Sequence, residues 1–236
     1  MTGQLLGADA IRAMLRELSE ELAAAGETAT LFVVGGAAMS LAFYARRVTG
    51  DVDAAFRPSA AVRDAAARVS ARRGLAEDWL NDGAKGFMPG TDPGASLEMS
   101  TPSLRVELAS AEYLLAMKIM AARVEQDTED VAFLYGHLGL TTVEQGVDLV
   151  VKYYGQAVAE RTFQMRSQYV LEGVVAGLGS RPSPGAGPGA GRGDGDGRVA
   201  GTGGVPQPVP CARCGRTLYS ERSIRRGTGP GCARRG

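Results

Sequence analysis

The chain has 236 residues, which is enough for one or two domains with a sizeable hydrophobic core. Its formal net charge is zero, but residues 1–175 contain 16 Lys and Arg against 23 Asp and Glu, whereas residues 176–236 contain 10 Arg against three acids. An acidic body and a basic tail exclude a uniformly basic nucleic-acid-binding surface, so we expect strong nucleic-acid contacts only at the tail or at a local patch.

Targeting signals and cysteine usage further narrow the class of protein to which the chain can belong. The N-terminus lacks the basic-then-apolar order of a signal peptide, and no apolar run approaches 18 residues. The three cysteines lie in the last 26 residues, which favours metal binding or free thiols over disulfides. We therefore expect a cytoplasmic protein without a membrane partner. The single histidine, His137, excludes a Ser/His/Asp or Cys/His catalytic centre.

The hydrophobic pattern predicts an α/β body, a flexible linker and a small tail. In chain order we expect a helix over 8–25, strands over 31–34 and 51–56, a helix over 59–73, a turn-rich segment over 75–87, an antiparallel strand pair over 95–99 and 104–108, and helices over 111–124, from Asp127 onward, over 142–154 and over 156–175. Residues 176–209 are half Gly and Pro, a composition typical of disordered linkers, and residues 210–236 are rich in Cys and Arg.

The stretch from Leu31 to Phe56 places two features of nucleotide chemistry close together. An apolar strand runs into Gly35-Gly36, whose bare backbone N–H groups can approach a phosphate. Asp51 and Asp53 alternate along the next strand, so their side chains share one face about 6.6 Å apart. Such carboxylates repel each other by about 2.5 kcal/mol at an effective dielectric of 20, and a magnesium ion with substrate phosphates would offset this cost. The alternative is a hairpin-bounded strand with two solvated aspartates.

The segments GGAAM and RRVTGDVDA resemble the signature of the DNA polymerase β nucleotidyltransferase superfamily, and of its minimal group that contains the AbiEii-type toxins. The resemblance implies a minimal nucleotidyltransferase mixed sheet with flanking helices and a C-terminal helical half. It also implies a Mg²⁺-dependent enzyme with two ions that moves a nucleoside monophosphate from a nucleoside triphosphate to an RNA, such as a tRNA 3′ end, or to a protein hydroxyl. Gly36 stands where many members have Ser, so a hydroxyl contact to phosphate is missing.

Glu107 and Lys118 are further candidates on other elements. Glu107 alternates with Val106 and Leu108, and a third carboxylate on a neighbouring strand is what two-metal nucleotidyl transfer needs. It could equally be an ordinary exposed strand acid. Lys118 lies among apolar residues in a chain that otherwise prefers Arg, and a lysine there could reach a triphosphate.

The segment LASAEYLLAMKIMAARVEQDTEDV resembles the second and third motifs of the AbiEii-like group. The resemblance implies that Lys118 and Arg123 contact nucleotide phosphates and that Asp127 or Asp130 orients the acceptor or acts as a base. The alternative from the residues themselves is a helix cap at Asp127, a first-turn dipole partner at Asp130 and a snorkelling Lys118.

The tail carries a second candidate metal site. Cys211-x-x-Cys214-Gly followed by Cys232 is a zinc-knuckle-like pattern. Glu221 or a second chain could supply the fourth ligand of Zn²⁺, and a three-ligand or empty site stays open. The alternative is a disordered tail with reduced thiols. Its seven arginines suit sequence-independent contacts with RNA phosphates.

Two functional hypotheses from different classes follow. The first is the nucleotidyltransferase, acting as the toxin of a toxin–antitoxin system with a cognate antitoxin as partner. The second is a catalytically inactive nucleotidyltransferase-like protein that binds nucleic acid through its Arg-rich tail. A role as antitoxin rather than toxin stays open at this point.

Overall fold

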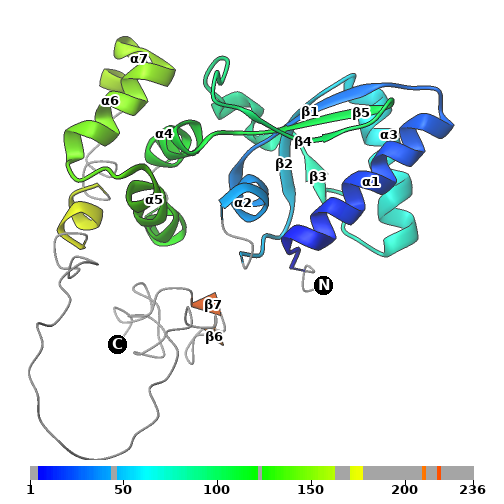
Figure 1. Cartoon of the computed structure of the whole chain (residues 1–236), viewed down its shortest axis with the longest axis horizontal. Helices are drawn as coiled ribbons and strands as arrows, with labels where there is room; N and C mark the ends of the chain where they lie inside the picture. Colours follow the sequence, from blue (N-terminus) through cyan, green and yellow to red (C-terminus); the bar gives the residue numbers. More distant parts are fainter. Residues whose placement is uncertain are drawn as a thin grey trace, which may run out of the picture.

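A five-stranded mixed sheet forms the centre of the molecule, in the order β3-β2-β1-β5-β4 (Figure 1). The computed structural model describes residues 5–43, 47–121, 124–162, 171–177, 209–210 and 217–218. The strands are β1 (Ala29–Val33), β2 (Val52–Arg57), β3 (Leu80–Asn81), β4 (Ser96–Ser100) and β5 (Leu104–Leu108). Strand β1 pairs antiparallel with β2 and parallel with β5, and β4 pairs antiparallel with β5. The expected α/β architecture with a mixed sheet is confirmed.

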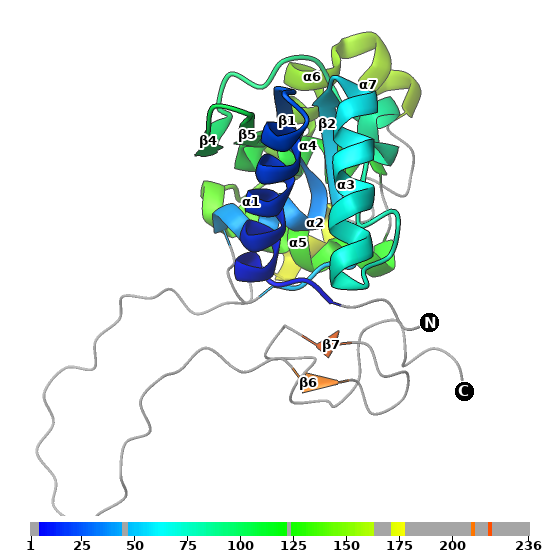
Figure 2. The ribbon, with the colours of Figure 1, turned by 90° about the vertical axis from the view of Figure 1, so that its right-hand side faces the viewer.

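Two helices cover one face of this sheet. Helices α1 (Ala8–Ala24) and α3 (Ser59–Arg73) lie side by side across it (Figure 2). Alternate strand residues such as Leu31, Val52 and Val106 are buried, whereas the residues between them are partly or fully exposed. This period of two gives the sheet one apolar face under the helices and one more polar face on the other side.

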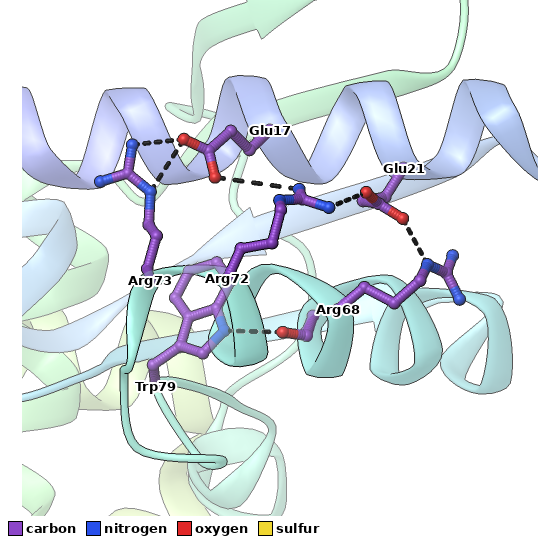
Figure 3. A network of polar contacts seen from close by, with 7 residues as sticks. Glu17, Glu21, Arg68, Arg72, Arg73 and Trp79 are labelled. Carbon is purple, nitrogen blue, oxygen red and sulfur yellow. Dashed lines mark hydrogen bonds and ion pairs between the residues drawn. The ribbon is translucent and has the colours of Figure 1, made fainter.

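Ion pairs join α1 to α3 along their outer edge (Figure 3). Glu17 accepts hydrogen bonds from Arg73, with Nε 2.8 Å from Oε1, and Glu21 accepts from Arg72 and Arg68. The hydrogen bond from Arg73 lowers the pKa of Glu17, and those from Arg72 and Arg68 lower the pKa of Glu21, because they favour the charged carboxylates. The network therefore stabilises the folded state only while these glutamates are ionised.

The network predicts a stability that depends on pH. A carboxylate whose pKa is lowered on folding stabilises the protein above its ordinary pKa of 4.5, and this contribution is lost as the pH falls through the lowered value. We expect Glu17→Gln/Glu21→Gln to unfold at a lower temperature than the natural chain at pH 7, and the difference to shrink as the pH falls below 4.5. Thermal unfolding between pH 7 and pH 3 measures this. Glu20→Gln, at an exposed site on α1, is the matched control, and an equal effect of both variants would contradict the prediction.

Trp79 is a core residue. Its side chain is 1% exposed and its indole Nε1 donates a 3.1 Å hydrogen bond to the Ala66 carbonyl of α3 (Figure 3). The expected turn-rich segment over 75–87 also contains the short strand β3, because Leu80 and Asn81 pair with Val52 and Asp53. A two-residue strand has too few positions to show an alternating pattern.

The C-terminal half of the body is helical, as expected. It contains α4 (Ala111–Ala121), α5 (Val124–Leu138), α6 (Val143–Tyr154), α7 (Gln156–Thr162) and a helix over 171–177. Edge-to-face aromatic contacts connect it to the sheet, with ring centroids 5.4 Å apart for Phe32 and Tyr113 and 5.3 Å apart for Tyr113 and Tyr153. Burial raises the pKa of the Tyr113 hydroxyl, which donates to the Pro89 carbonyl.

The other described segments are short. Strand β1 is followed by α2 (Gly35–Ala38) and a π-helical turn, η1 (Met39–Phe43), and β3 by a 3₁₀ turn, η2 (Gly83–Phe87). In the tail, β6 (Val209–Pro210) pairs antiparallel with β7 (Thr217–Leu218). The predicted linker over 176–209 falls almost wholly outside the described residues and stays a prediction. Within the described ranges, no helix combines the length and the apolar composition that crossing a membrane requires.

Candidate functional site

The site begins where β1 ends beside the start of β2. Antiparallel pairing sets Val33 opposite Ala54, and the Val34 N–H donates a 2.9 Å hydrogen bond to the Asp53 carbonyl. The chain then enters the Gly35-Gly36 turn directly next to the two aspartates. The pairing of the two strands thus brings the predicted phosphate cradle and the predicted carboxylate pair together.

Position 35 requires glycine for two reasons: its backbone conformation and its closeness to the Asp53 carboxylate. Its φ of +63° is a conformation that residues with a side chain adopt rarely. A Cβ at this position would lie 3.1 Å from the Asp53 Oδ2 atom, so the bare glycine lets the carboxylate approach the turn closely.

Gly36 faces a residue that sequence reasoning missed. A Cβ on Gly36 would lie 2.7 Å from Thr49 Oγ1 and 3.1 Å from Thr49 Cβ. Thr49 is held there by two backbone hydrogen bonds with Leu6, of 2.7 and 3.0 Å. The Thr49 hydroxyl therefore occupies the space in which a serine side chain at position 36 would begin. The feature of the sequence that could have indicated Thr49 is its position two residues before Asp51.

This contact predicts a dependence between positions 36 and 49. We expect Gly36→Ala to lower the free energy of unfolding by about 1–3 kcal/mol, because the added methyl group overpacks against a short side chain whose backbone is fixed. Thr49→Ala in the same chain should recover part of that loss, since the Oγ1 atom is removed. Urea unfolding of both single variants and the double variant measures the coupling. Additive effects of the two substitutions would refute the contact.

Asp51 and Asp53 lie on the side of β2 that α1 and α3 do not cover. Val52 between them is buried, whereas both aspartates are partly exposed. Asn81 on β3 donates from Nδ2 to Asp51 Oδ2 at 2.9 Å, and its Oδ1 accepts from the Gly83 N–H at 2.9 Å, so the amide orients the carboxylate. Sequence analysis also did not identify Asn81 as a site residue, because only the pairing of β2 with β3 brings it to Asp51.

This pair of carboxylates fits a magnesium site. Oxygen ligands from one or two carboxylates together with substrate phosphates are the arrangement that Mg²⁺ prefers in nucleotide-binding sites, and the Gly35 turn beside Asp53 leaves room for such a phosphate. In the described part of the chain, no three or more His, Cys, Asp or Glu side chains are grouped so that they could hold a metal ion.

Glu107 lies on the same face of the sheet as Asp53, the open face that α1 and α3 do not cover, but its carboxylate is paired with Arg105. It pairs with Phe32 in register and accepts hydrogen bonds from Arg105 Nε and Nη2, at 3.1 and 2.6 Å. Asp53 sits opposite Val34, two residues further along β1. Two strand spacings and two residues along the strand place the Cα atoms of Glu107 and Asp53 about 12 Å apart. Its role as a third metal ligand stays a prediction.

Lys118, Asp127 and Asp130 meet in a buried charge cluster with Arg47. The Lys118 Nζ atom lies 2.9 Å from Asp127 Oδ1 and 2.6 Å from Asp130 Oδ2. Asp130 also accepts from Arg47 Nη1. The two aspartates are 3% and 2% exposed and Lys118 is 7% exposed. The cluster has two positive and two negative charges, which suits burial because each charge has an opposite partner.

The cluster connects the helical half to the glycine turn. Arg47 reaches Asp130 on α5, and its Nε atom lies 3.9 Å from where a Cβ on Gly36 would be. The expectation that Asp127 caps a helix is wrong, because α5 already begins at Val124 and Asp127 faces Lys118 from inside the helix. Arg123, Cys211, Cys214 and Cys232 lie outside the described residues, so their predicted nucleotide and zinc contacts stay predictions.

The cluster predicts that Lys118 contributes to stability. Lys118→Met would leave two buried carboxylates with one cation of the cluster, and we expect a loss of about 3 kcal/mol in the free energy of unfolding. Lys118→Met/Asp127→Asn should recover part of this loss, because the surplus negative charge is removed with the lysine. Urea unfolding tests both expectations. An unchanged stability of Lys118→Met would show that the cluster contributes nothing.

The mixed sheet, the glycine turn and the carboxylate pair together define a nucleotidyltransferase-like domain. Residues 10–151, more than half of the chain, match the model of a family described as a nucleotidyltransferase of unknown function (DUF6036), and the chain belongs to this family. Residues 202–235 match the model of a second family, described only as a family of unknown function (DUF6011). No curated protein and no solved structure matches the chain.

Proposed function

We propose that the protein is a Mg²⁺-dependent nucleotidyltransferase that moves a nucleoside monophosphate from a nucleoside triphosphate to a hydroxyl acceptor. The observation that supports this most directly is the contact of Asp53 with the bare Gly35 turn, in a chain of a nucleotidyltransferase family. Carboxylates and phosphate-binding backbone groups are both needed for this reaction, and here the pairing of β1 with β2 makes them neighbours.

Each residue has a distinct part in the proposed reaction. Asp51 and Asp53 would hold the magnesium, which when bound would neutralise the triphosphate and activate the attacking oxygen. The N–H groups of Gly35 and Gly36 would bind the phosphates, and the Thr49 hydroxyl beside Gly36 would supply the contact that a serine makes in related proteins. The acceptor oxygen forms its bond to the α-phosphorus as the bond to the bridging oxygen breaks in line, pyrophosphate leaves and the hydroxyl proton passes to solvent.

The buried cluster suggests that Asp127 and Asp130 position other residues, whereas the family resemblance implied that one of them orients the acceptor or acts as a base. Both carboxylates are occupied by Lys118 or Arg47 and almost fully buried. They would fix Arg47 beside the glycine turn, and the contact of Lys118 with the triphosphate stays a prediction. The toxin and antitoxin roles, the zinc-binding tail and its RNA contacts stay predictions.

The proposed function predicts label transfer from a nucleoside triphosphate. The full chain is incubated with each α-³²P nucleoside triphosphate, Mg²⁺ and total RNA, and the RNA and protein fractions are counted separately. We expect transfer that Asp51→Ala and Asp53→Ala each reduce by about 10²–10³-fold, because an electrostatic partner of the transition state is removed.

Asp64→Ala is the matched control, since Asp64 is an exposed aspartate on α3, away from the open face. Transfer that persists in both active-site variants would overturn the assignment of the carboxylates. RNA binding without any transfer would instead support a catalytically inactive binding protein.

A further inference from the structure

A hollow of about 690 Å³ lies at the end of the sheet remote from the glycine turn. It is lined by the segment entering β1, by the end of β2 and by the turn between β4 and β5. Its hydroxyl-bearing residues are Thr28, Thr30, Thr101 and Ser103. Two arginines, Arg57 and Arg105, complete its polar lining. Two guanidinium groups together with hydroxyl donors are the chemistry that binds phosphate oxygens.

The strand register aims both arginines at the same side of the sheet. Strands β2, β1 and β5 are neighbours in the sheet (Figure 1). Thr30 on β1 pairs with Arg57 on β2 and with Arg105 on β5, so the three residues form one row across these strands. Residues directly opposite each other in neighbouring strands have their side chains on one face. All three are on the face that carries Asp53, because Arg57 follows Asp53 by four residues along β2.

The charges of the row are directed outward. Arg57 and Arg105 are both exposed. Arg105 uses Nε and Nη2 for Glu107, which fixes its guanidinium and leaves Nη1 for another acceptor. Within the described residues, no ion pair or hydrogen bond involves the Arg57 side chain, whereas Arg63, Arg68, Arg72 and Arg73 on α3 all contact carboxylates. In an acidic body, such a site attracts an anion locally.

The distance between the row and the aspartates fits a polymeric acceptor. Arg57 lies four positions after Asp53 along the strand, which is a distance of about 13 Å. A nucleic-acid strand covers this distance in about two to four nucleotides, depending on how closely its bases stack. Ala55 and the half-buried Phe32, whose ring packs edge-to-face against Tyr113, lie between the two positions on the same face.

We propose that the Arg57–Thr30–Arg105 row binds a backbone phosphate of a single-stranded RNA acceptor whose 3′ hydroxyl reaches Asp51 and Asp53. The inference rests on the proposed function and makes it more specific: the acceptor is a nucleic acid rather than a protein hydroxyl, and the open face of the sheet, in addition to the tail, binds it. Phosphate contacts of this kind fix the position of a strand without selecting its sequence.

Direct binding provides the first test. A 5′-fluorescein-labelled RNA of 12 nucleotides is titrated with the full chain, and fluorescence anisotropy is followed at several salt concentrations. We expect Arg57→Ala/Arg105→Ala to bind about five- to tenfold more weakly and the slope of log K against log salt to fall by about 0.7 for the lost phosphate contact. The tail is present in every variant, so differences in RNA affinity between the variants measure the contribution of the row.

Two control variants accompany this test. Arg16→Ala removes an exposed arginine of α1, which covers the opposite face, and should leave RNA binding unchanged. Arg57→Lys/Arg105→Lys keeps both charges and should retain most of the affinity. Thermal unfolding of each variant shows whether the fold is intact.

Acceptor length provides the second test, in the labelled-nucleotide assay with RNAs of 2, 4, 8 and 12 nucleotides. With the natural chain we expect the KM for the acceptor to fall between two and four nucleotides, where the strand first reaches the row. In Arg57→Ala/Arg105→Ala this fall should disappear, with the KM for the nucleoside triphosphate unchanged.

The outcomes separate this inference from the function on which it rests. One outcome is that Arg57→Ala/Arg105→Ala transfers the label to RNA with the same RNA affinity and the same acceptor KM as the natural chain. This result would contradict the proposed role of the row, but it would still support the nucleotidyltransferase function. Weakened RNA binding in that variant, without transfer by the natural chain, would support the row as an RNA site and remove the enzymatic function. Label found on protein instead of RNA would overturn the inference.

Discussion

The antiparallel pairing of β1 with β2 is the constraint on which the rest of the site depends. It sets the end of one strand beside the start of the other, and thereby presses the Asp53 carboxylate against the bare backbone of Gly35. The segment that connects β1 to β2 must therefore end close to the Gly35-Gly36 turn at which it begins. It does so with Thr49 against Gly36 and Arg47 close by, so the intervening residues build one wall of the site instead of merely connecting two strands.

The two faces of the sheet divide structure from proposed function. On one face, α1 and α3 bury the apolar alternate residues and neutralise their own charges in the network around Glu17 and Glu21 (Figure 3). On the other face, the alternating positions are polar or only half-buried, and run from Asp53 to Arg57 along a single strand. A strand with period two can serve both purposes at once, because each residue belongs to only one face. This arrangement gives the proposed nucleotide site and the proposed acceptor site a common rigid support.

The buried cluster gives the helical half a reason to be part of the same unit. Asp130 on α5 contacts both Lys118 on α4 and Arg47 beside the glycine turn. Buried charges are retained only when they are well paired, so a displacement of α4 or α5 would expose unmatched charge and disturb the turn. The aromatic contacts of Tyr113 with Phe32 and Tyr153 reinforce the same connection from the sheet side. The helices thus hold the site in place even where they contribute no residue to the reaction.

Features encoded by short segments could be determined from the sequence alone. The helix over 59–73, the strand over 104–108 and the succession of glycine turn and aspartates were all predicted, because periodicity and turn chemistry act over a few residues. The sequence did not reveal the Thr49 hydroxyl beside Gly36, the hold of Asn81 on Asp51 or the burial of Lys118 between two aspartates. It also did not show that Arg57 and Arg105 share one row. Each of these contacts joins residues that lie far apart in the chain or on different elements, and strand register and helix packing alone bring them together.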